Sequence, residues 1–146
     1  MRKAWLSETC KIIQDRQDTD IQSLTILDLW ILSRLSNLTR ILNSSLRSFD
    51  FHIAVHCLYV FWWHEFCDVY LEYSKQYLPR TEHDVIVDEN RRKVIARLFA
   101  TVADIYLRSA APFLPFLTEE LYSTLPIIKN GDASIHQAAF PASLVN

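Results

Sequence analysis

The scarcity of glycine is the strongest constraint that this sequence places on its fold. Gly131 is the only glycine among 146 residues. Tight β-hairpin turns and glycine-rich phosphate loops both require glycine at particular positions. The sequence therefore argues against a turn-rich β architecture and excludes a phosphate loop or a dinucleotide-binding fingerprint. Half of the residues are hydrophobic, which is enough for the core of one domain.

Apolar residues recur at steps of three and four from Leu24 to Phe49, which is the spacing of one face of an α-helix. We expect a helix over about residues 24–48. This helix should bury its apolar stripe and present a polar, weakly basic face on another side. That polar face carries Ser33, Asn37, Arg40, Ser44 and Arg47.

A second helix is expected over about residues 51–78, with Asp50 as its N-cap. Its first half is apolar nearly all round between Val55 and Trp63. A helix without a polar face is usually buried between other helices. We therefore expect the second helix to lie at the centre of the domain.

A connector at residues 79–87 separates the second helix from a third. Asp88 should cap the third helix, which continues with helical periodicity to about Ala110. Pro112 and Pro115 then interrupt the chain, because proline lacks the amide hydrogen that a helix interior needs.

The last part of the chain is predicted to hold a short helix and an irregular tail. Thr118 should cap this fourth helix, which ends near Leu125, and residues 134–140 are expected to be extended. Four helices with short connections predict an all-α fold, an up-down helical bundle. We divide the chain into a leader (1–22), the bundle (23–126) and an extended C-terminal tail (127–146).

The formal net charge of −2 argues against a strong nucleic-acid binder. Residues 29–49 differ, because they contain no Asp or Glu but include Arg34, Arg40 and Arg47. Trp30 lies one turn before Arg34, and arginine beside an exposed aromatic ring suits single-stranded RNA. The alternative is a solvated helix face with Trp30 in the core. Our candidate RNA-contact residues are Trp30, Arg34, Asn37, Arg40 and Arg47.

No other cluster in the sequence predicts catalysis or metal binding. His52 and His56 are four residues apart, as zinc ligands often are, but the HExxH and CxxC patterns are absent. Cys67 has acidic and aromatic neighbours in place of the electropositive setting of a catalytic thiol. The three sparse cysteines, Cys10, Cys57 and Cys67, are typical of reduced intracellular thiols.

Three segments of the sequence are distinctive: Asp28–Asn37, Glu65–Glu72 and Ala111–Tyr122. In this order and spacing they resemble the C-terminal helical domain of class I valyl-tRNA synthetases. The second segment separates the valyl type from its isoleucyl and leucyl relatives better than the others, and the third is shared more widely. The likeness covers about residues 27–141.

The resemblance implies a helical bundle that binds the anticodon arm of a valine-specific tRNA. In the family, a separate catalytic domain uses ATP to attach valine. The family's His-Ile-Gly-His-like and Lys-Met-Ser-Lys-Ser-like signatures are absent, so we expect no catalysis and no cofactor in this chain. The expected partners are valine tRNA and, if this is part of a longer chain, the catalytic domain, but not membranes or DNA. The expected location is the cytoplasm, with mitochondria as the alternative.

One departure from the family keeps a second function open. Leu29 occupies the position where the family commonly has an arginine after the aspartate. Loss of a cation there would weaken contact with tRNA. The alternative function is a protein-interaction module that derives from such a domain and has lost tRNA binding.

Overall fold

The computed structural model describes residues 24–78, 88–125 and 134–142. All of its regular elements are helical, and no strand occurs in these three ranges, which confirms the all-α prediction. The elements are α2 (Ile26–Arg47), α3 (Phe51–Val60), the π-helical η2 (Phe61–Leu71), α4 (Glu72–Ser74), the 3₁₀ turn η3 (Lys75–Tyr77), α5 (Glu89–Ala110) and α6 (Pro115–Thr124).

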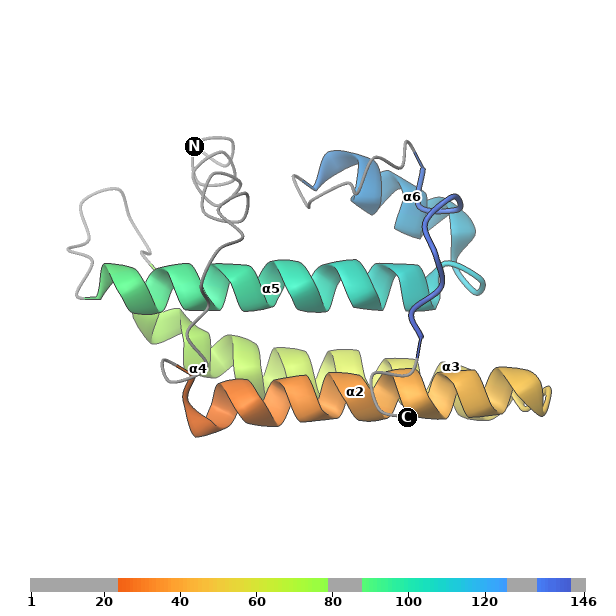
Figure 1. The fold of residues 1–146 in the computed structure, drawn as a ribbon, viewed down its shortest axis with the longest axis horizontal. Helices are drawn as coiled ribbons and strands as arrows, with labels where there is room; N and C mark the ends of the chain where they lie inside the picture. The colour runs from red at the N-terminus through yellow and green to blue at the C-terminus, as the bar shows by residue number, and fades with distance from the viewer. Residues whose placement is uncertain (1–23, 79–87, 126–133, 143–146) are drawn as a thin grey trace.

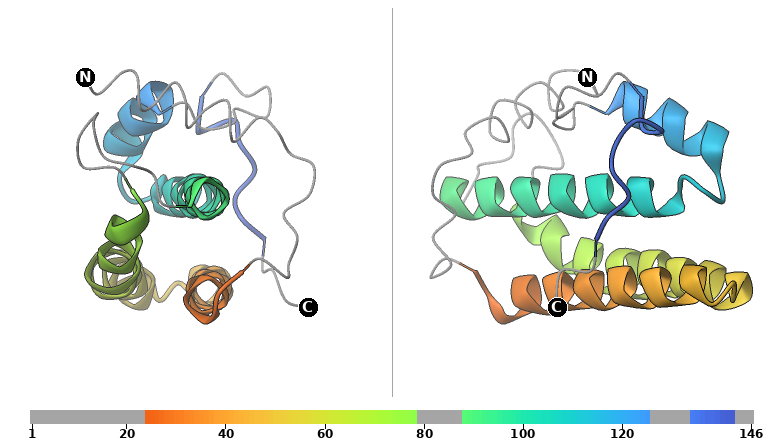
Figure 2. Two further views of the ribbon diagram at one scale, coloured as in Figure 1. Left: turned by 90° about the vertical axis from the view of Figure 1, so that its left-hand side faces the viewer. Right: turned by 45° about the vertical axis from the view of Figure 1, so that its right-hand side comes forward.

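Three long rods form the body of the molecule. They are α2, the continuous run from α3 through η3, and α5, and they lie roughly side by side (Figures 1 and 2). The shorter α6 packs on the side of α5 that faces away from α2. In the ranges that the structure describes, no helix is both long and apolar enough to cross a bilayer.

The apolar stripe of α2 packs into the core as its periodicity predicts. Ile31, Leu35, Leu38 and Leu42 are all buried there. They contact a shared cluster that also contains residues of α3, η2 and α5. The outer face of α2 is left to solvent, so the helix presents its polar side as expected.

The second rod contains a long π-helical segment, which the sequence did not reveal. Its buried aromatic residues Phe61, Phe66 and Tyr70 are spaced by five and then four residues. A π-helical turn adds one residue to the repeat and so re-aims the following side chains. Within this segment the adjacent residues Glu65 and Phe66 are both buried.

The second helix, expected at the centre of the domain, is covered by other helices on part of its surface only. Phe61 is buried, as expected for a central helix, but Val55, Tyr59 and Trp63 are each about half exposed. The physical reason is that only α2 and α5 cover this rod, so one face has no neighbouring helix in the described parts of the chain.

The three predicted caps have different outcomes. The carboxylate of Asp88 accepts a hydrogen bond from Arg91 N at 2.9 Å, which confirms the cap of α5. Asp50 occupies the N-cap position of α3, but its side chain accepts from Ser48 Oγ at 2.6 Å and caps nothing. The Thr118 cap is wrong, because α6 begins three residues earlier with a proline in its first turn.

The tail is also different from the prediction where it is described. Residues 134–138 form turns, in which Gln137 N donates to Ser134 O at 3.1 Å, instead of an extended segment. The predicted leader, residues 1–22, and the predicted connector, residues 79–87, lie outside the described residues.

Candidate nucleic-acid interface

The outer face of α2 presents two of the candidate arginines to solvent. Arg40 is exposed, and its Nη2 donates to Asn37 Oδ1 at 2.8 Å. Arg47 is exposed in the last turn of α2, where a positive charge is favourable beside the helix C-terminus. Both cations lie on a helix that carries no acid after Asp28. An anion can therefore approach this face without meeting a carboxylate from α2.

Arg34 is committed to an ion pair. Its Nε donates to Glu65 Oε1 at 2.7 Å, and its Nη2 contacts the same oxygen. The Glu65 carboxylate is largely buried, whereas the Arg34 side chain keeps 39% of its surface exposed. The hydrogen bond to Glu65 raises the pKa of Arg34 above its usual value. This pair joins α2 to η2, and sequence reasoning missed it because no role was assigned to Glu65.

Trp30 and Leu29 have contrasting environments at the start of α2. Trp30 is partly buried and packs against the core, so only part of its ring is open to a base. Leu29 is half-exposed, and the neighbouring Ile26 is almost fully exposed. An arginine at position 29 would point to solvent, and its replacement by leucine therefore removes a surface cation.

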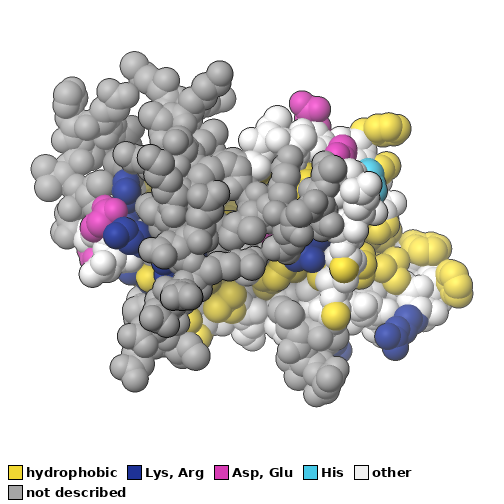
Figure 3. Space-filling view, turned by 45° about the horizontal axis from the view of Figure 1, so that its top comes forward, with side chains coloured by type: hydrophobic (Ala, Val, Ile, Leu, Met, Phe, Trp, Pro, Cys, Tyr) yellow, Lys and Arg dark blue, Asp and Glu magenta, His cyan; other side chains and the backbone are white. Residues whose placement is uncertain are grey.

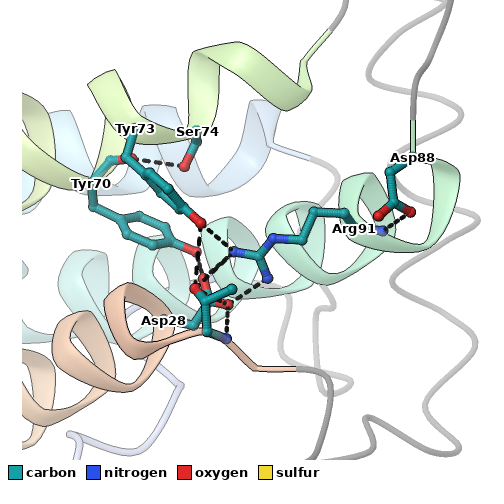
Figure 4. Close-up of polar contacts among 7 residues, drawn as sticks. Asp28, Tyr70, Tyr73, Ser74, Asp88 and Arg91 are labelled. Carbon is teal, nitrogen blue, oxygen red and sulfur yellow. Dashed lines mark hydrogen bonds and ion pairs between the residues drawn. The ribbon is translucent and has the colours of Figure 1, made fainter.

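A buried polar network lies beneath this end of α2 (Figure 4). The side chains of Asp28 from α2, Tyr70 from η2 and Arg91 from α5 converge there. Arg91 Nη2 donates to Asp28 Oδ1 at 2.9 Å, and Tyr70 Oη donates to the same oxygen at 2.7 Å. Arg91 Nη1 donates to the second carboxylate oxygen, and Thr25 N does so at 2.8 Å. Thr25 Oγ1 donates to that second oxygen as well, at 3.0 Å, so the two oxygens of Asp28 have five donors between them.

The electrostatics of the network favour the ion pair. Burial alone would raise the pKa of Asp28, but hydrogen bonds from Arg91, Thr25 and Tyr70 outweigh burial and hold this pKa below its ordinary value. Burial and the neighbouring Asp28 both raise the pKa of Tyr70, so its hydroxyl stays protonated and remains a donor. The guanidinium of Arg91 also lies over the ring of Tyr77, 5.4 Å from the centroid.

The described tail crosses from α6 over α5 to α2 (Figure 1). On α6, Glu119 Oε2 accepts from Ser134 Oγ at 2.8 Å and from Ile135 N at 3.0 Å. On α5, Arg108 Nη1 donates to Ala139 O at 3.1 Å. On α2, Asn43 Nδ2 donates to Pro141 O at 3.0 Å. The tail therefore ties all three helices together and flanks the outer face of α2.

Among the residues that the structure describes, neither a metal-binding group nor a reactive cysteine is found. His52 and His56 are exposed, and no group of three potential ligands among those residues could hold a metal ion. Burial raises the pKa of Cys57 to about 11. Burial and the charge of Asp68 raise the pKa of Cys67 as well. Both thiols are therefore poor nucleophiles near neutral pH.

Comparison with known proteins identifies the family. A family model for the anticodon-binding domain of tRNA ligase matches residues 28–145. Valine–tRNA ligase of Thermotoga maritima is 36% identical over 115 residues, which cover 79% of this chain and 12% of that protein. The enzyme of Fervidobacterium nodosum is 39% identical over 112 residues, covering 77% and 12%. The enzyme of Ehrlichia canis is 35% identical over 136 residues, covering 92% and 16%.

The chain thus spans a small part, 12–16%, of the length of these curated relatives. The three segments on which the resemblance rests all lie within residues 28–145, the range that the family model matches. Asp28 and Glu65, which open the first two of those segments, are the two buried acids that join α2 to its neighbours. The chain belongs to the family of anticodon-binding domains of tRNA ligases.

Proposed function

We propose that this domain binds the anticodon arm of a valine tRNA and acts by non-covalent positioning. The observation that carries the proposal is the outer face of α2, where Arg40 and Arg47 are exposed, Asn37 is partly exposed beside Arg40, and no acid of the same helix competes. Phosphates need cations, and exposed amides can read unpaired bases. The family match and the valine–tRNA ligase relatives support tRNA as the ligand.

The rigid support of α2 also favours this function. Asp28 and Glu65 fix the first half of the helix through Arg91 and Arg34, and Asn43 fixes the second half to the tail. Side chains on a fixed helix lose less conformational entropy on binding than side chains on a mobile loop. The domain therefore suits a task in which an RNA arm must be held in one orientation.

Titration of valine tRNA against a non-cognate tRNA at two salt concentrations tests the proposal. Arg34 is already paired, so we expect about two phosphate contacts, from Arg40 and Arg47. For single-stranded RNA this corresponds to a slope of roughly −1.4 in log K against log salt. Equal and salt-independent binding of both tRNAs, or no binding at low salt, would contradict the proposal.

A protein-interaction module is the second candidate, and two observations favour it. The half-exposed Leu29 replaces a surface cation, and Glu65 neutralises Arg34. In either case we propose that the chain works without a cofactor of its own, ATP being used by the catalytic domain of the family. We also propose that it acts in the cytoplasm, with mitochondria as the alternative because one relative is a probable mitochondrial valine–tRNA ligase of Dictyostelium discoideum.

A further inference from the structure

An apolar stripe with no covering helix in the described chain begins in the turn after α2 and continues along the outward side of the second rod. We call Phe49, Phe51, Val55, Tyr59 and Trp63 the outer stripe. The last four are spaced by four residues and are each 49–54% exposed, and Phe49 is 76% exposed. Hydrophobic side chains gather at the end of the molecule where α2 turns into α3 (Figure 3). Exposure of this much aromatic surface in contiguous positions is unusual for a face that contacts only water.

The aromatic rings of the outer stripe are ordered against one another. Tyr59 and Trp63 are stacked with centroids 6.4 Å apart and planes 9° from parallel. Phe49 and Phe51 pack edge to face with centroids 6.2 Å apart. Interface centres are enriched in such large side chains, because they bury much area and lose little conformational freedom. The stripe is therefore already in a conformation that a partner could use.

Phe49 gives a second, independent indication. Its φ angle is 61°, in the left-handed region that favours glycine. A phenylalanine there incurs backbone strain, and its ring is mostly in water. Neither the core nor the turn needs this ring, since glycine or asparagine would complete the turn with less strain. The presence of phenylalanine at this position is better explained by a contact between its ring and a partner surface.

The charges around the stripe indicate which kind of partner fits. No Asp, Glu, Lys or Arg occurs from Phe51 to Trp63, and no Lys or Arg occurs between Arg47 and Lys75. Along the stripe itself, from Phe49 to Trp63, a nucleic-acid backbone would therefore find no permanent cation, the nearest being Arg47 at the end of α2. When an uncharged, apolar polypeptide surface packs against the stripe, no charged group has to give up its hydration. The stripe therefore favours a protein surface over an RNA, in contrast to the outer face of α2.

The length of the relatives indicates where that protein surface comes from. The matched region is only 12% of the Thermotoga maritima enzyme, so most of such a polypeptide lies outside the region that this chain resembles. With full aromatic side chains at roughly 150–250 Å² each, the exposed stripe is on the order of 500 Å². That is more than half of the roughly 800 Å² that each side of a standard interface buries.

We propose that the outer stripe is the docking face for an uncharged, apolar surface on another part of a valine–tRNA ligase polypeptide. This inference goes beyond tRNA binding and does not depend on it, because it concerns the second rod and not α2. The contact would fix the orientation of α2 relative to the rest of the ligase. It would also bury the ring of Phe49, which offsets the strain at that residue.

Carbene footprinting read by mass spectrometry tests the proposal. The samples are this chain alone and a whole Thermotoga maritima valine–tRNA ligase in which residues 28–145 of this chain, the range that the family model matches, replace the corresponding segment. If the exchanged enzyme does not fold, the same labelling is measured on the unaltered Thermotoga maritima enzyme, at the residues that correspond to the outer stripe. Each sample is labelled with and without valine tRNA, and sedimentation velocity records its mass.

We expect residues 49–63 to be strongly labelled in the chain alone and labelled near background in the whole enzyme without tRNA. The outer face of α2 should stay labelled in the whole enzyme until tRNA is added. Strong labelling of residues 49–63 in the whole enzyme would overturn the proposal. If residues 49–63 are protected from labelling only when tRNA is present, the stripe binds RNA. If they are protected in the chain alone, to a degree that rises with dimer formation, the stripe binds a second copy of the chain. Both outcomes also overturn the proposal.

A pair of matched substitutions gives a second test with a different readout. Trp63→Ser should lower the unfolding temperature of the chain alone only modestly, because the ring is half in water. The same substitution should lower the unfolding temperature of the bundle within the whole enzyme by clearly more. Thr101→Ala on α5, where the side chain is exposed and polar, is the control and should change neither value. Equal effects of Trp63→Ser in both settings would contradict docking through the stripe.

Discussion

Arg91 binds both carboxylate oxygens of Asp28 although the two residues are 63 positions apart in the chain. The pair is almost completely buried, at 8% and 0% exposure of the two side chains. It joins α2 to α5, and Tyr70 adds the second rod to the same carboxylate. Three helices thus meet at one charged contact, whose loss would leave an unpaired charge inside the protein.

We predict that Arg91→Met destabilises the domain by about 3–5 kcal/mol, because Asp28 would remain buried without its cation. Urea unfolding followed by circular dichroism measures the change. The double variant Asp28→Leu/Arg91→Met should recover a large part of the loss, since neither charge is left behind. Arg40→Ala is the matched control on the exposed side of α2 and should change stability by no more than about 0.5 kcal/mol. A loss below 1 kcal/mol for Arg91→Met would contradict the role of the pair.

Asp28 should also make the domain sensitive to acid. Its pKa in the folded state is lowered below the ordinary value of 3.8, so it contributes stability that is present above that value and is lost as the pH falls toward the folded-state pKa. We expect the free energy of unfolding to decline below about pH 5. Asp28→Asn should be less stable at pH 7 and show a shallower decline. A decline of equal steepness in the parent and in Asp28→Asn would assign the acid sensitivity to other carboxylates.

Phe61→Ala should cost about 3–5 kcal/mol, because the ring is buried and contributes to the common core of α2, the second rod and α5. Trp63→Ala, two residues later on the same rod, is a demanding control because it removes a larger ring. It should cost clearly less, since that ring is half in water. Equilibrium denaturation of the two variants makes the comparison, and similar losses would show that the exposed face is packed more tightly than the structure indicates.

Local pattern was enough to predict the helices, but not the contacts between them. The buried stripe of α2 follows from steps of three and four, and the Asp88 cap follows from a preferred residue at a helix start. The π-helical register of η2 carries no such signal, because it adds one residue without a proline or glycine to mark it. Apolar composition alone also did not show which face of α3 lacks a neighbour.

The candidate site shows the same division. An acid-free stretch with three arginines could be recognised in the sequence, and two of the arginines are indeed exposed on one helix face. The pairing of Arg34 with Glu65 depends on how α2 and η2 are packed, which no local pattern reports. Glu65 was nevertheless a visible signal, since an acid between apolar residues on a central helix needs a buried partner.

Phe49→Gly should stabilise the isolated chain by about 0.5–1 kcal/mol, because glycine adopts a positive φ without the penalty that a side chain incurs. The loss of the edge-to-face contact with Phe51 works against this gain, but the Phe49 ring is largely and the Phe51 ring half in water. Thermal unfolding measures the effect. Phe51→Gly, at the start of α3, is the control and should destabilise, since glycine is unfavourable in a helix. A less stable Phe49→Gly variant would indicate that the ring supports the turn itself.

Arg40→Ala/Arg47→Ala should weaken the binding of valine tRNA and flatten its salt dependence toward zero, because two accessible cations are lost from α2. Both side chains are exposed, so the fold should remain intact by circular dichroism. Lys75→Ala/Lys93→Ala removes the same charge from other elements and is the control for a general effect of net charge. Arg34→Ala should instead lower stability, since it leaves the largely buried Glu65 without its partner. Equal affinities of the Arg40→Ala/Arg47→Ala variant and the parent would reject the outer face of α2 as the binding site and favour the protein-interaction module.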